Sequence, residues 1–227
     1  MTDVIITGAG KGIGFSLVEE FVKLSGYRIL AISRNIGKLK KFDPETVISA
    51  SIDLGKADAI SSILHLIGVH SFAPEILINN AGLLINKAFQ DLSPADFDAV
   101  FHINVKAPFL LSQALLPHFR PNAHIVNIGS MGGFQGSAKF AGLSLYSASK
   151  AALTTLSECM AEEFKNLNIK VNCLALGAAR TEMLAEAFPG YHAPVSAEEM
   201  ARFIAGFAQN GHHFFNGKIL PVSLSTP

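Results

Sequence analysis

The sequence predicts an α/β protein built on a doubly wound parallel sheet of about seven strands, with helices on both faces. Three observations predict this fold class: short apolar runs alternate with longer helical patterns, the apolar runs are nearly continuous, and no linker or internal repeat divides them. Continuous apolar strands are typical of sheets covered on both faces, and right-handed crossovers then favour the doubly wound arrangement. We therefore expect residues 1–227 to form a single domain.

The predicted strands are short runs rich in valine, isoleucine and leucine, bounded by polar or turn-forming residues. Each run has four to seven residues, a length that fits a strand better than a helix. In chain order they are Val4–Thr7, Arg28–Ile32, Thr46–Ile52, Ile76–Asn79, His124–Ile128, Ile169–Leu174 and Lys218–Val222.

The predicted helices show apolar residues at helical spacing and N-terminal caps. Ser93 followed by Pro94 has the pattern of an N-cap with proline at the first helical position, and it opens a helix towards Phe119. Pro108 should kink that helix or mark its second segment. The other predicted helices are Gly12–Leu24, Ala57–Ile67, Tyr146–Leu167 and a capped helix from Ser196.

The composition excludes several classes of protein. Hydrophobic residues make up 49% of the chain and charged residues 16%, which excludes an intrinsically disordered chain. Eighteen basic residues balance eighteen acidic ones, so no positive excess is available for a nucleic acid. We find no apolar run long enough to cross a bilayer and no secretory pattern at the N-terminus. We expect a cytoplasmic protein without a nucleic-acid or membrane partner.

A metal centre is also not expected. Cys159 and Cys173 cannot make a disulfide framework or a zinc site by themselves. The adjacent pair His212 and His213 cannot face one point on a regular element, so we interpret both as loop histidines.

A glycine-rich turn, Thr7–Gly14, directly follows the first predicted strand and opens the first predicted helix. Glycines let the backbone turn sharply and approach a pyrophosphate, while the helix N-terminus offers N–H groups and a favourable dipole. The alternative is a tight strand-to-helix turn that binds nothing. The glycine-rich turn follows the first strand of an alternating β/α pattern, and this position favours phosphate binding.

Tyr146 and Lys150 are four residues apart at the start of a helical pattern, so they share one face. A phenol with a pKa near 10 is a poor proton donor or acceptor at neutral pH. A nearby ammonium stabilises the phenolate and lowers that pKa, which suits general acid/base catalysis. The alternative is an ordinary tyrosine and a solvated lysine, since this spacing is common.

Several motifs occur in order along the chain, and together they resemble the short-chain dehydrogenase/reductase family, in its single-domain branch. They are Thr7-Gly8-x-x-x-Gly12-Ile13-Gly14, Asn79-Asn80-Ala81-Gly82, Asn104, Ser130 and Tyr146-Ser147-Ala148-Ser149-Lys150. The resemblance implies a Rossmann-type fold and an NAD(P)-dependent oxidoreductase that interconverts a carbonyl and a secondary alcohol by hydride transfer. The alternative is a non-catalytic NADP(H)-binding sensor or scaffold, because a fold does not fix a function.

The resemblance implies a proton relay. Tyr146 is the general acid/base, and Lys150 binds the cofactor ribose and lowers the pKa of Tyr146. Asn104 lies in the middle of an apolar helical pattern, where asparagine is a poor helix former. In the family, this asparagine holds a water that links Lys150 to bulk solvent; a helix irregularity near Pro108 is the alternative.

Ser130 resembles the family's active-site serine, which hydrogen-bonds the substrate oxygen. It precedes Tyr146 by sixteen positions, a few more than the family usually shows. The intervening segment is glycine-rich and can bulge outward without moving either end. Ser137 and Ser144 are alternatives, but neither directly ends an apolar strand, so we favour Ser130.

Cofactor choice is predicted from charge at the end of the second strand. Sites for NAD place a carboxylate there, whereas this chain has Ser33 and Arg34. Arg34 can bind a 2′-phosphate through its guanidinium, and Lys11 adds a second positive charge. These residues favour NADP(H), with NAD(H) as the alternative. The expected cofactor-binding residues are Gly8, Lys11, Gly12, Ile13, Gly14, Ser33, Arg34, Asp53, Leu54, Asn80, Ala81, Gly82, Tyr146, Lys150, Gly177 and Thr181.

The substrate end is predicted to follow the sixth strand. Gly177 and Thr181 match the family there, although the usual proline before the glycine is missing. The segments 132–143 and 182–195 lack a regular pattern, and the second carries expected pocket walls: Met183, Leu184, Phe188 and Tyr191. The sequence does not identify the small-molecule carbonyl or alcohol substrate.

Helices 97–116 and 147–164 carry more apolar residues than one sheet-facing side needs. The residues that suggest a surplus are Leu110, Leu111, Leu115, Leu153, Leu156 and Met160. The resemblance implies a homodimer or homotetramer through these helices.

Overall fold

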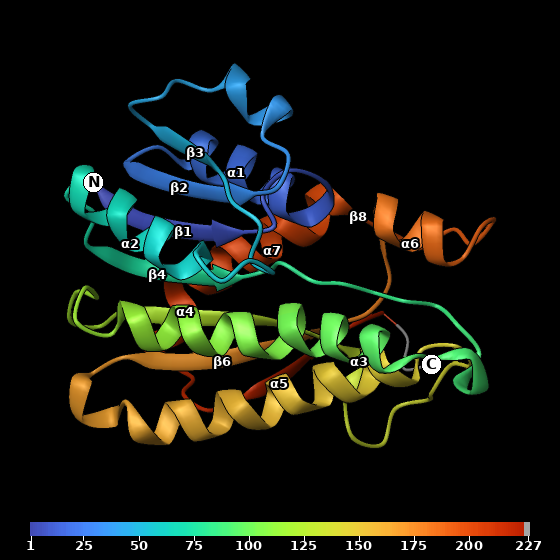
Figure 1. The fold of residues 1–227 in the computed structure, drawn as a ribbon. Coiled ribbons are helices and arrows are strands. Elements are labelled where there is room, and N and C mark those ends of the chain that lie inside the picture. The colour runs from blue at the N-terminus through green and yellow to red at the C-terminus, as the bar shows by residue number, and fades with distance from the viewer. Residues whose placement is uncertain (225–227) are drawn as a thin grey trace.

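The computed structural model describes residues 1–224 and contains a seven-stranded parallel sheet in the order β3-β2-β1-β4-β5-β6-β9 (Figure 1). Its strands are β1 (Thr2–Thr7), β2 (Tyr27–Ser33), β3 (Val47–Ser51), β4 (Pro74–Asn79), β5 (His124–Ser130), β6 (Lys170–Leu176) and β9 (Ile219–Val222). The strand order reverses between β1 and β4, which is where doubly wound sheets bind their ligands. A second, two-stranded sheet pairs β7 (Ala179–Arg180) with β8 (Val195–Ser196).

The helices connect successive strands. The α-helices are α1 (Gly12–Leu24), α2 (Ala59–Val69), α3 (Pro94–Phe101), α4 (Ala107–Leu115), α5 (Ser144–Glu163), α6 (Glu182–Ala187) and α7 (Ala197–Asn210). A π-helical turn, η3 (His102–Lys106), joins α3 to α4, and short 3₁₀ turns lie at 37–41, 89–91, 131–133, 165–167 and 211–213. Within the described residues, no helix is both long and apolar enough to cross a membrane.

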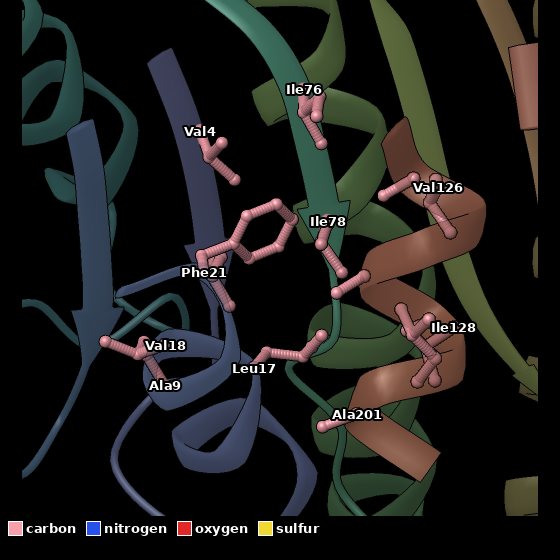
Figure 2. Close-up of a cluster of buried hydrophobic side chains, with 14 of the residues drawn as sticks. Val4, Ala9, Leu17, Val18, Phe21, Ile76, Ile78, Val126, Ile128 and Ala201 are labelled. Atoms are coloured by element: carbon pink, nitrogen blue, oxygen red, sulfur yellow. The ribbon is translucent and has the colours of Figure 1, made fainter. Parts of the chain in front are cut away.

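Helices cover both faces of the sheet, as the sequence predicts. In Figure 1, α2, α4 and α5 lie on the face towards the viewer, with α1 and α7 behind. Figure 2 shows the core on the α1/α7 face, where Leu17 and Phe21 of α1 lie among sheet residues such as Ile78. Fully burying one such side chain contributes about 1.5–3 kcal/mol. The core therefore fixes the sheet edge that carries the candidate site.

The predicted strands are confirmed, and so is the second segment predicted at Pro108 in the helix from Ser93. The π-helical turn η3 interrupts that helix, because Pro108 has no N–H for the carbonyl of Asn104, and α4 then begins with Pro108 in its first turn. Three other predictions change. The helix expected over residues 57–67 runs from Ala59 to Val69. The helix expected over residues 146–167 begins at Ser144 and ends at Glu163.

The third change concerns the segment 182–195, which was expected to lack regular structure. It begins with helix α6, because the Thr181 hydroxyl caps that helix by accepting a 3.2 Å hydrogen bond from the backbone N–H of Leu184. Segment 132–143 was also expected to lack regular structure. Its first two residues belong to the 3₁₀ turn η4 (Met131–Gly133), and the rest is a loop that leads to α5.

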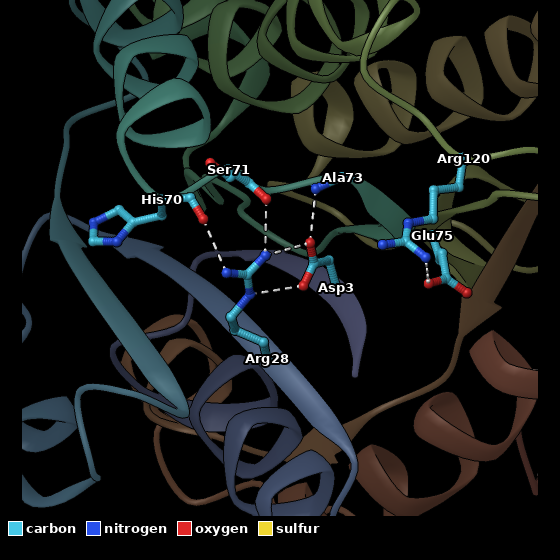
Figure 3. Close-up of polar contacts among 7 residues, drawn as sticks. All are labelled: Asp3, Arg28, His70, Ser71, Ala73, Glu75 and Arg120. Atoms are coloured by element: carbon cyan, nitrogen blue, oxygen red, sulfur yellow. Dashed lines mark hydrogen bonds and ion pairs between the residues drawn. The ribbon is translucent and has the colours of Figure 1, made fainter.

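A partly buried ion pair joins the amino ends of the central strands (Figure 3). Arg28 on β2 donates from Nε and Nη2 to the two carboxylate oxygens of Asp3 on β1, at 2.9 and 2.8 Å. The same guanidinium donates to the carbonyls of His70 and Ser71 and lies 4.5 Å from the ring centroid of Phe72. The pair ties β1 and β2 to the segment that leads into β4.

Candidate active site

A cavity of about 770 Å³ opens at the carboxyl ends of the parallel strands, on the edge where α6 lies. Every residue that the sequence predicts for the cofactor lines it, and Ser130 lines it as well. Asn104 alone among the predicted site residues lies outside the lining. The tertiary structure thus gathers segments from both halves of the chain into one concave site.

The glycine turn is shaped by contacts that no larger residue allows. A Cβ at Gly8 would lie 2.8 Å from Cα of Ala81, and a Cβ at Gly14 would lie 2.2 Å from the carbonyl oxygen of Gly8. Gly8 and Gly12 also have φ angles of 68° and 53°, the left-handed region that glycine adopts without strain. The turn therefore brings bare backbone to the cavity surface, which is the geometry a bound pyrophosphate needs.

The Asn-Asn-Ala-Gly segment after β4 locks this turn in place. Thr7 Oγ1 accepts hydrogen bonds from the backbone N–H groups of Asn80 and Ala81, at 3.1 and 3.0 Å. The side-chain amide of Asn80 donates back to the carbonyls of Thr7 and Gly8. Asn79 instead bonds Asn127 on β5, so it supports the centre of the sheet.

The N-terminus of α1 has no side-chain cap, since Lys11 occupies the N-cap position and makes no capping hydrogen bond. Unsatisfied backbone N–H groups at a helix N-terminus attract anions. Ser33 lies against the turn, because a Cβ at Gly10 would be 2.4 Å from Ser33 Oγ, and Arg34 is exposed beside it. These residues fit the phosphate groups of a dinucleotide.

The adenine and nicotinamide ends contain residues with additional structural roles. Asp53 Oδ1 accepts a 3.0 Å hydrogen bond from the backbone N–H of Gly55, so Asp53 shapes a turn and also lines the cavity, as Leu54 does. Gly177 is required by a close approach, because a Cβ there would lie 2.4 Å from Ser223 Oγ. This contact constrains the loop from which the family's proline is missing.

Tyr146, Lys150 and Ser130 line the cavity together, and the Tyr146 and Ser130 side chains are hydrogen-bonded to each other. The Lys150 ammonium is buried, lies 5.8 Å from the Tyr146 ring centroid and donates a 2.7 Å hydrogen bond to the carbonyl of Ile128. Burial lowers the pKa of Lys150 to about 8. Gly133 permits this packing, since a Cβ there would lie 2.8 Å from Lys150 Cβ.

The pKa of Tyr146 differs from the expectation. Burial of the phenol raises its pKa above the usual value, and the neighbouring Ser130 hydroxyl acts in the opposite direction. The sequence predicted a pKa lowered by Lys150, but the Lys150 ammonium bonds the Ile128 carbonyl, and burial of the phenol has the largest effect on the pKa of Tyr146. The Tyr146 phenol is therefore protonated at neutral pH in the cofactor-free protein.

The two alternative serines do not compete with Ser130. Ser137 Oγ donates to the carbonyls of Met131 and Phe134, and Ser144 is exposed at the start of α5; neither lines the cavity. The backbone N–H of Gly132 donates to Ser130 Oγ at 3.1 Å, which fixes that hydroxyl at the end of β5.

Asn104 is fully buried, and its side chain is committed to protein partners. Its Nδ2 donates to the carbonyl of Leu83 and to Ser149 Oγ, both at 2.9 Å, and its Oδ1 accepts from the backbone N–H of Leu83 at 2.7 Å. The amide therefore ties η3 to α5 and to the segment after β4. Its position inside a π-helical turn also confirms the helix irregularity considered from the sequence.

The structure adds cavity residues that the sequence did not single out. Leu83, Leu84, Phe140 and Leu143 line the cavity, as do the four predicted wall residues of segment 182–195. Phe140 and Leu143 lie just before Tyr146 in the chain, a position that could have indicated them.

Two acids of α6 were also missed, because that segment was expected to be irregular. Glu186 lies 3.4 Å from Lys11 Nζ, and Glu182 lies 3.5 Å from Lys38 Nζ. Of these four residues, Lys11 and Glu182 line the cavity. Among residues 1–224, no three or more His, Cys, Asp or Glu side chains are grouped to hold a metal ion.

Comparisons with known proteins agree with this geometry. A family model described as short chain dehydrogenase matches residues 2–192. The 3alpha-hydroxysteroid dehydrogenase of Mediterraneibacter gnavus is 29% identical over 237 residues, which cover 96% of this chain and 94% of that protein.

Solved structures agree as well. A 4-hydroxyisoleucine dehydrogenase complexed with NADH superposes with a TM-score of 0.88 at 26% identity, covering 98% of this chain and 97% of the other. A short chain dehydrogenase from Burkholderia cenocepacia in complex with NADP shares the fold, with a TM-score of 0.85 at 24% identity and coverage of 98% and 96%. The chain therefore belongs to the short-chain dehydrogenase family of oxidoreductases, as its ordered motifs predicted.

Proposed function

We propose that the protein is an NADP(H)-dependent oxidoreductase that interconverts a carbonyl and a secondary alcohol, with Tyr146 as general acid and base. The observation that carries this proposal is that Tyr146, Ser130 and Lys150 line the same cavity as the glycine turn. The turn would hold the pyrophosphate of a dinucleotide, and Lys150 would hold its ribose. A non-catalytic sensor has no need of this proton relay.

The chain's own residues handle the proton while the nicotinamide, when bound, supplies a hydride to the carbonyl carbon or accepts one from the alcohol. Tyr146 donates its proton to the carbonyl oxygen, and its raised pKa keeps the phenol in the protonated form that reduction requires. The Ser130 hydroxyl donates to the same oxygen and stabilises the charge that develops on it.

Lys150 stabilises the phenolate left behind. With a pKa of about 8, the amine is mostly charged at neutral pH, so an opposite charge lies close to the ionised phenol. Its bond to Ile128 uses one of three N–H donors, and the others serve the cofactor ribose. We assign the relay water to the main-chain carbonyl of Asn104, since Pro108 cannot donate to that carbonyl and the side-chain amide is already used.

Preference for NADP(H) over NAD(H) is supported by the residues at the end of β2. Sites for NAD have a carboxylate at this position, which would repel a 2′-phosphate, whereas this chain has Ser33 and Arg34. Arg34 is exposed and lines the cavity, so its guanidinium is available to a 2′-phosphate. Similar solved structures hold either NADH or NADP, so the relatives support a nicotinamide cofactor and the charge argument carries the choice between the two.

The test is replacement of Tyr146 by phenylalanine. Tyr146→Phe should bind NADPH normally and lose about a hundred-fold or more in turnover, because it removes the positioned proton donor. The matched control is Tyr27→Phe on β2, whose hydroxyl bonds Gln209 outside the cavity, and it should keep wild-type turnover. NADPH oxidation against a panel of carbonyl compounds gives the readout. Wild-type turnover by Tyr146→Phe would remove Tyr146 from the mechanism.

We also propose that the protein forms a homodimer or homotetramer through α3–α4 and α5. Of the six leucine and methionine residues that suggested an apolar surplus, Leu111, Leu115, Leu153 and Met160 are buried in this chain, so the surplus is smaller than expected. Phe97 and Phe109 remain 47% and 41% exposed on the α3–α4 segment and provide the contact surface. Light scattering at micromolar concentration tests this assembly, and a monomer would contradict it.

A further inference from the structure

The substrate end of the cavity has walls from three segments that are distant in sequence. Leu83 follows β4, Phe140 and Leu143 precede the catalytic Tyr146, and Leu184 and Phe188 belong to α6 and its end. These five side chains are hydrocarbon, and Met183 and Tyr191 of the same segment as Leu184 also line the cavity. The hydroxyls of Tyr146 and Ser130 thus share the cavity with walls that are mainly apolar.

Hydrogen bonds outside the cavity join the three walls into one unit. Asn86 Nδ2 donates a 2.8 Å bond to the carbonyl of Ala187 at the end of α6. The backbone N–H of Lys87 donates a 3.0 Å bond to the carbonyl of Gly142, next to Leu143. The apolar surfaces are thus held in a fixed arrangement, and a preformed apolar pocket selects ligands by shape and hydrocarbon content.

Three cations that lie close in sequence to the wall segments bond other groups of the protein. Lys87 pairs with Asp96 at 2.8 Å, Lys139 donates to the carbonyl of Phe134 at 2.8 Å, and Arg180 donates to the carbonyl of Ala193 at 3.0 Å. None of these three cations lines the cavity.

The cations that do line the cavity serve other groups. In the described part of the chain they are Lys11 and Arg34 at the cofactor end and Lys150 beside Tyr146. An anionic substrate group at the apolar end would lose its hydration without gaining a counter-charge.

We infer that the physiological substrate is an uncharged carbonyl compound whose carbonyl is flanked by a hydrocarbon ring or bulky aliphatic group, and not a keto acid, a phosphate ester or a polyhydroxylated sugar. The inference rests on the proposed function, because it concerns the same site. It adds the chemical class of the substrate, which the catalytic residues alone leave open.

The experiment compares three ring ketones that differ only in the substituent opposite the carbonyl: 4-tert-butylcyclohexanone, 4-(hydroxymethyl)cyclohexanone and 4-oxocyclohexanecarboxylate. The readout is kcat/KM with NADPH for the wild-type protein. We expect the tert-butyl compound to exceed the carboxylate by at least about tenfold, with the hydroxymethyl compound between them, since each apolar contact contributes to discrimination.

A pair of matched variants tests whether the apolar walls cause this order. Leu184→Arg places a cation at the substrate end and should raise kcat/KM for the carboxylate by about tenfold while lowering it for the tert-butyl compound. The control, Leu167→Arg, makes the same change at a residue that is 51% exposed and outside the cavity, and it should leave the order unchanged.

The outcomes separate the two proposals. A wild-type preference for the carboxylate, or an order of substrates that Leu184→Arg leaves unchanged, would overturn the substrate class. The proposed function would still stand in that case if Tyr146→Phe abolishes turnover. If the wild-type protein reduces none of the three ketones but reduces another compound of the carbonyl panel, the substrate class is overturned and the proposed function stands. If it reduces no compound of the panel, both proposals are overturned.

Discussion

The Lys11 ammonium in the glycine turn lies 3.4 Å from the Glu186 carboxylate on α6, which connects two residues 175 positions apart in the chain. A second pair of the same kind joins Lys38 to Glu182 at 3.5 Å. Under the proposed function, Glu186 would compete with a cofactor phosphate for Lys11, which lines the cavity. Exposed ion pairs of this kind are weak, so a bound phosphate can displace them.

Neutralising Glu186 should strengthen cofactor binding. Glu186→Gln removes the negative charge that neutralises Lys11, so the Lys11 ammonium is left free for a phosphate. We expect the dissociation constant of NADPH to fall by about two- to fivefold at low salt. Isothermal titration calorimetry measures this change. Glu163→Gln, an exposed acid on α5 outside the cavity, is the control and should have no effect. Unchanged or weaker binding by Glu186→Gln would contradict the competition.

Replacing Arg34 should separate the two cofactors. Arg34→Ala removes a guanidinium that lies beside the cavity, so the Michaelis constant for NADPH should rise about tenfold while that for NADH stays nearly unchanged. Ser33→Asp should shift the preference towards NADH, because its carboxylate repels a 2′-phosphate and accepts the ribose hydroxyls. Steady-state kinetics with both cofactors gives the answer. Equal losses with NADPH and NADH would show that Arg34 supports the loop in general.

Lys150 should make the stability of the cofactor-free protein rise with pH. Its pKa is about 8 in the folded chain and 10.5 without the fold, so between these values the unfolded state binds more protons and the free energy of unfolding increases with pH. The cost of the buried charge is present below pH 8 and is gone above pH 10.5. The full change is about 3 kcal/mol.

Comparison with Lys150→Met isolates this contribution, since the other titrating groups cancel in the difference. Urea unfolding of both proteins from pH 7.5 to 10 should show the wild type gaining stability relative to the variant, by about 2–3 kcal/mol across that range. If the difference in unfolding free energy between the two proteins does not change with pH, the Lys150 ammonium is hydrated in the folded protein.

The Asp3–Arg28 pair should be important for stability. Arg28→Met leaves the Asp3 carboxylate buried, at 2% exposure, with only the backbone N–H of Ala73 as a hydrogen-bond donor from another segment. Removing one partner of a buried pair costs about 3–5 kcal/mol, and the partial exposure of Arg28 favours the lower figure. Urea unfolding measures the loss. Glu162→Gln breaks an exposed pair with Lys165 and should change stability by less than about 1 kcal/mol.

The sequence by itself determined the fold class, the order of the strands along the chain and the family. These follow from local signals: apolar runs of strand length, the cap at Ser93, and motifs whose residues lie within a few positions of one another, such as Tyr146 and Lys150. Local patterns can be read directly because the residues that produce them are neighbours in the chain.

Other features were decided by the tertiary structure alone. The pKa of Tyr146 depends on burial by segments far away in sequence, and the apolar substrate end needs Leu83, Phe140 and Leu184 to meet across more than one layer of the fold. The ion pair between Lys11 and Glu186 requires α6 to lie beside the first turn. Solvent exclusion and the meeting of distant segments depend on packing, and no periodicity or short motif in the sequence encodes either one.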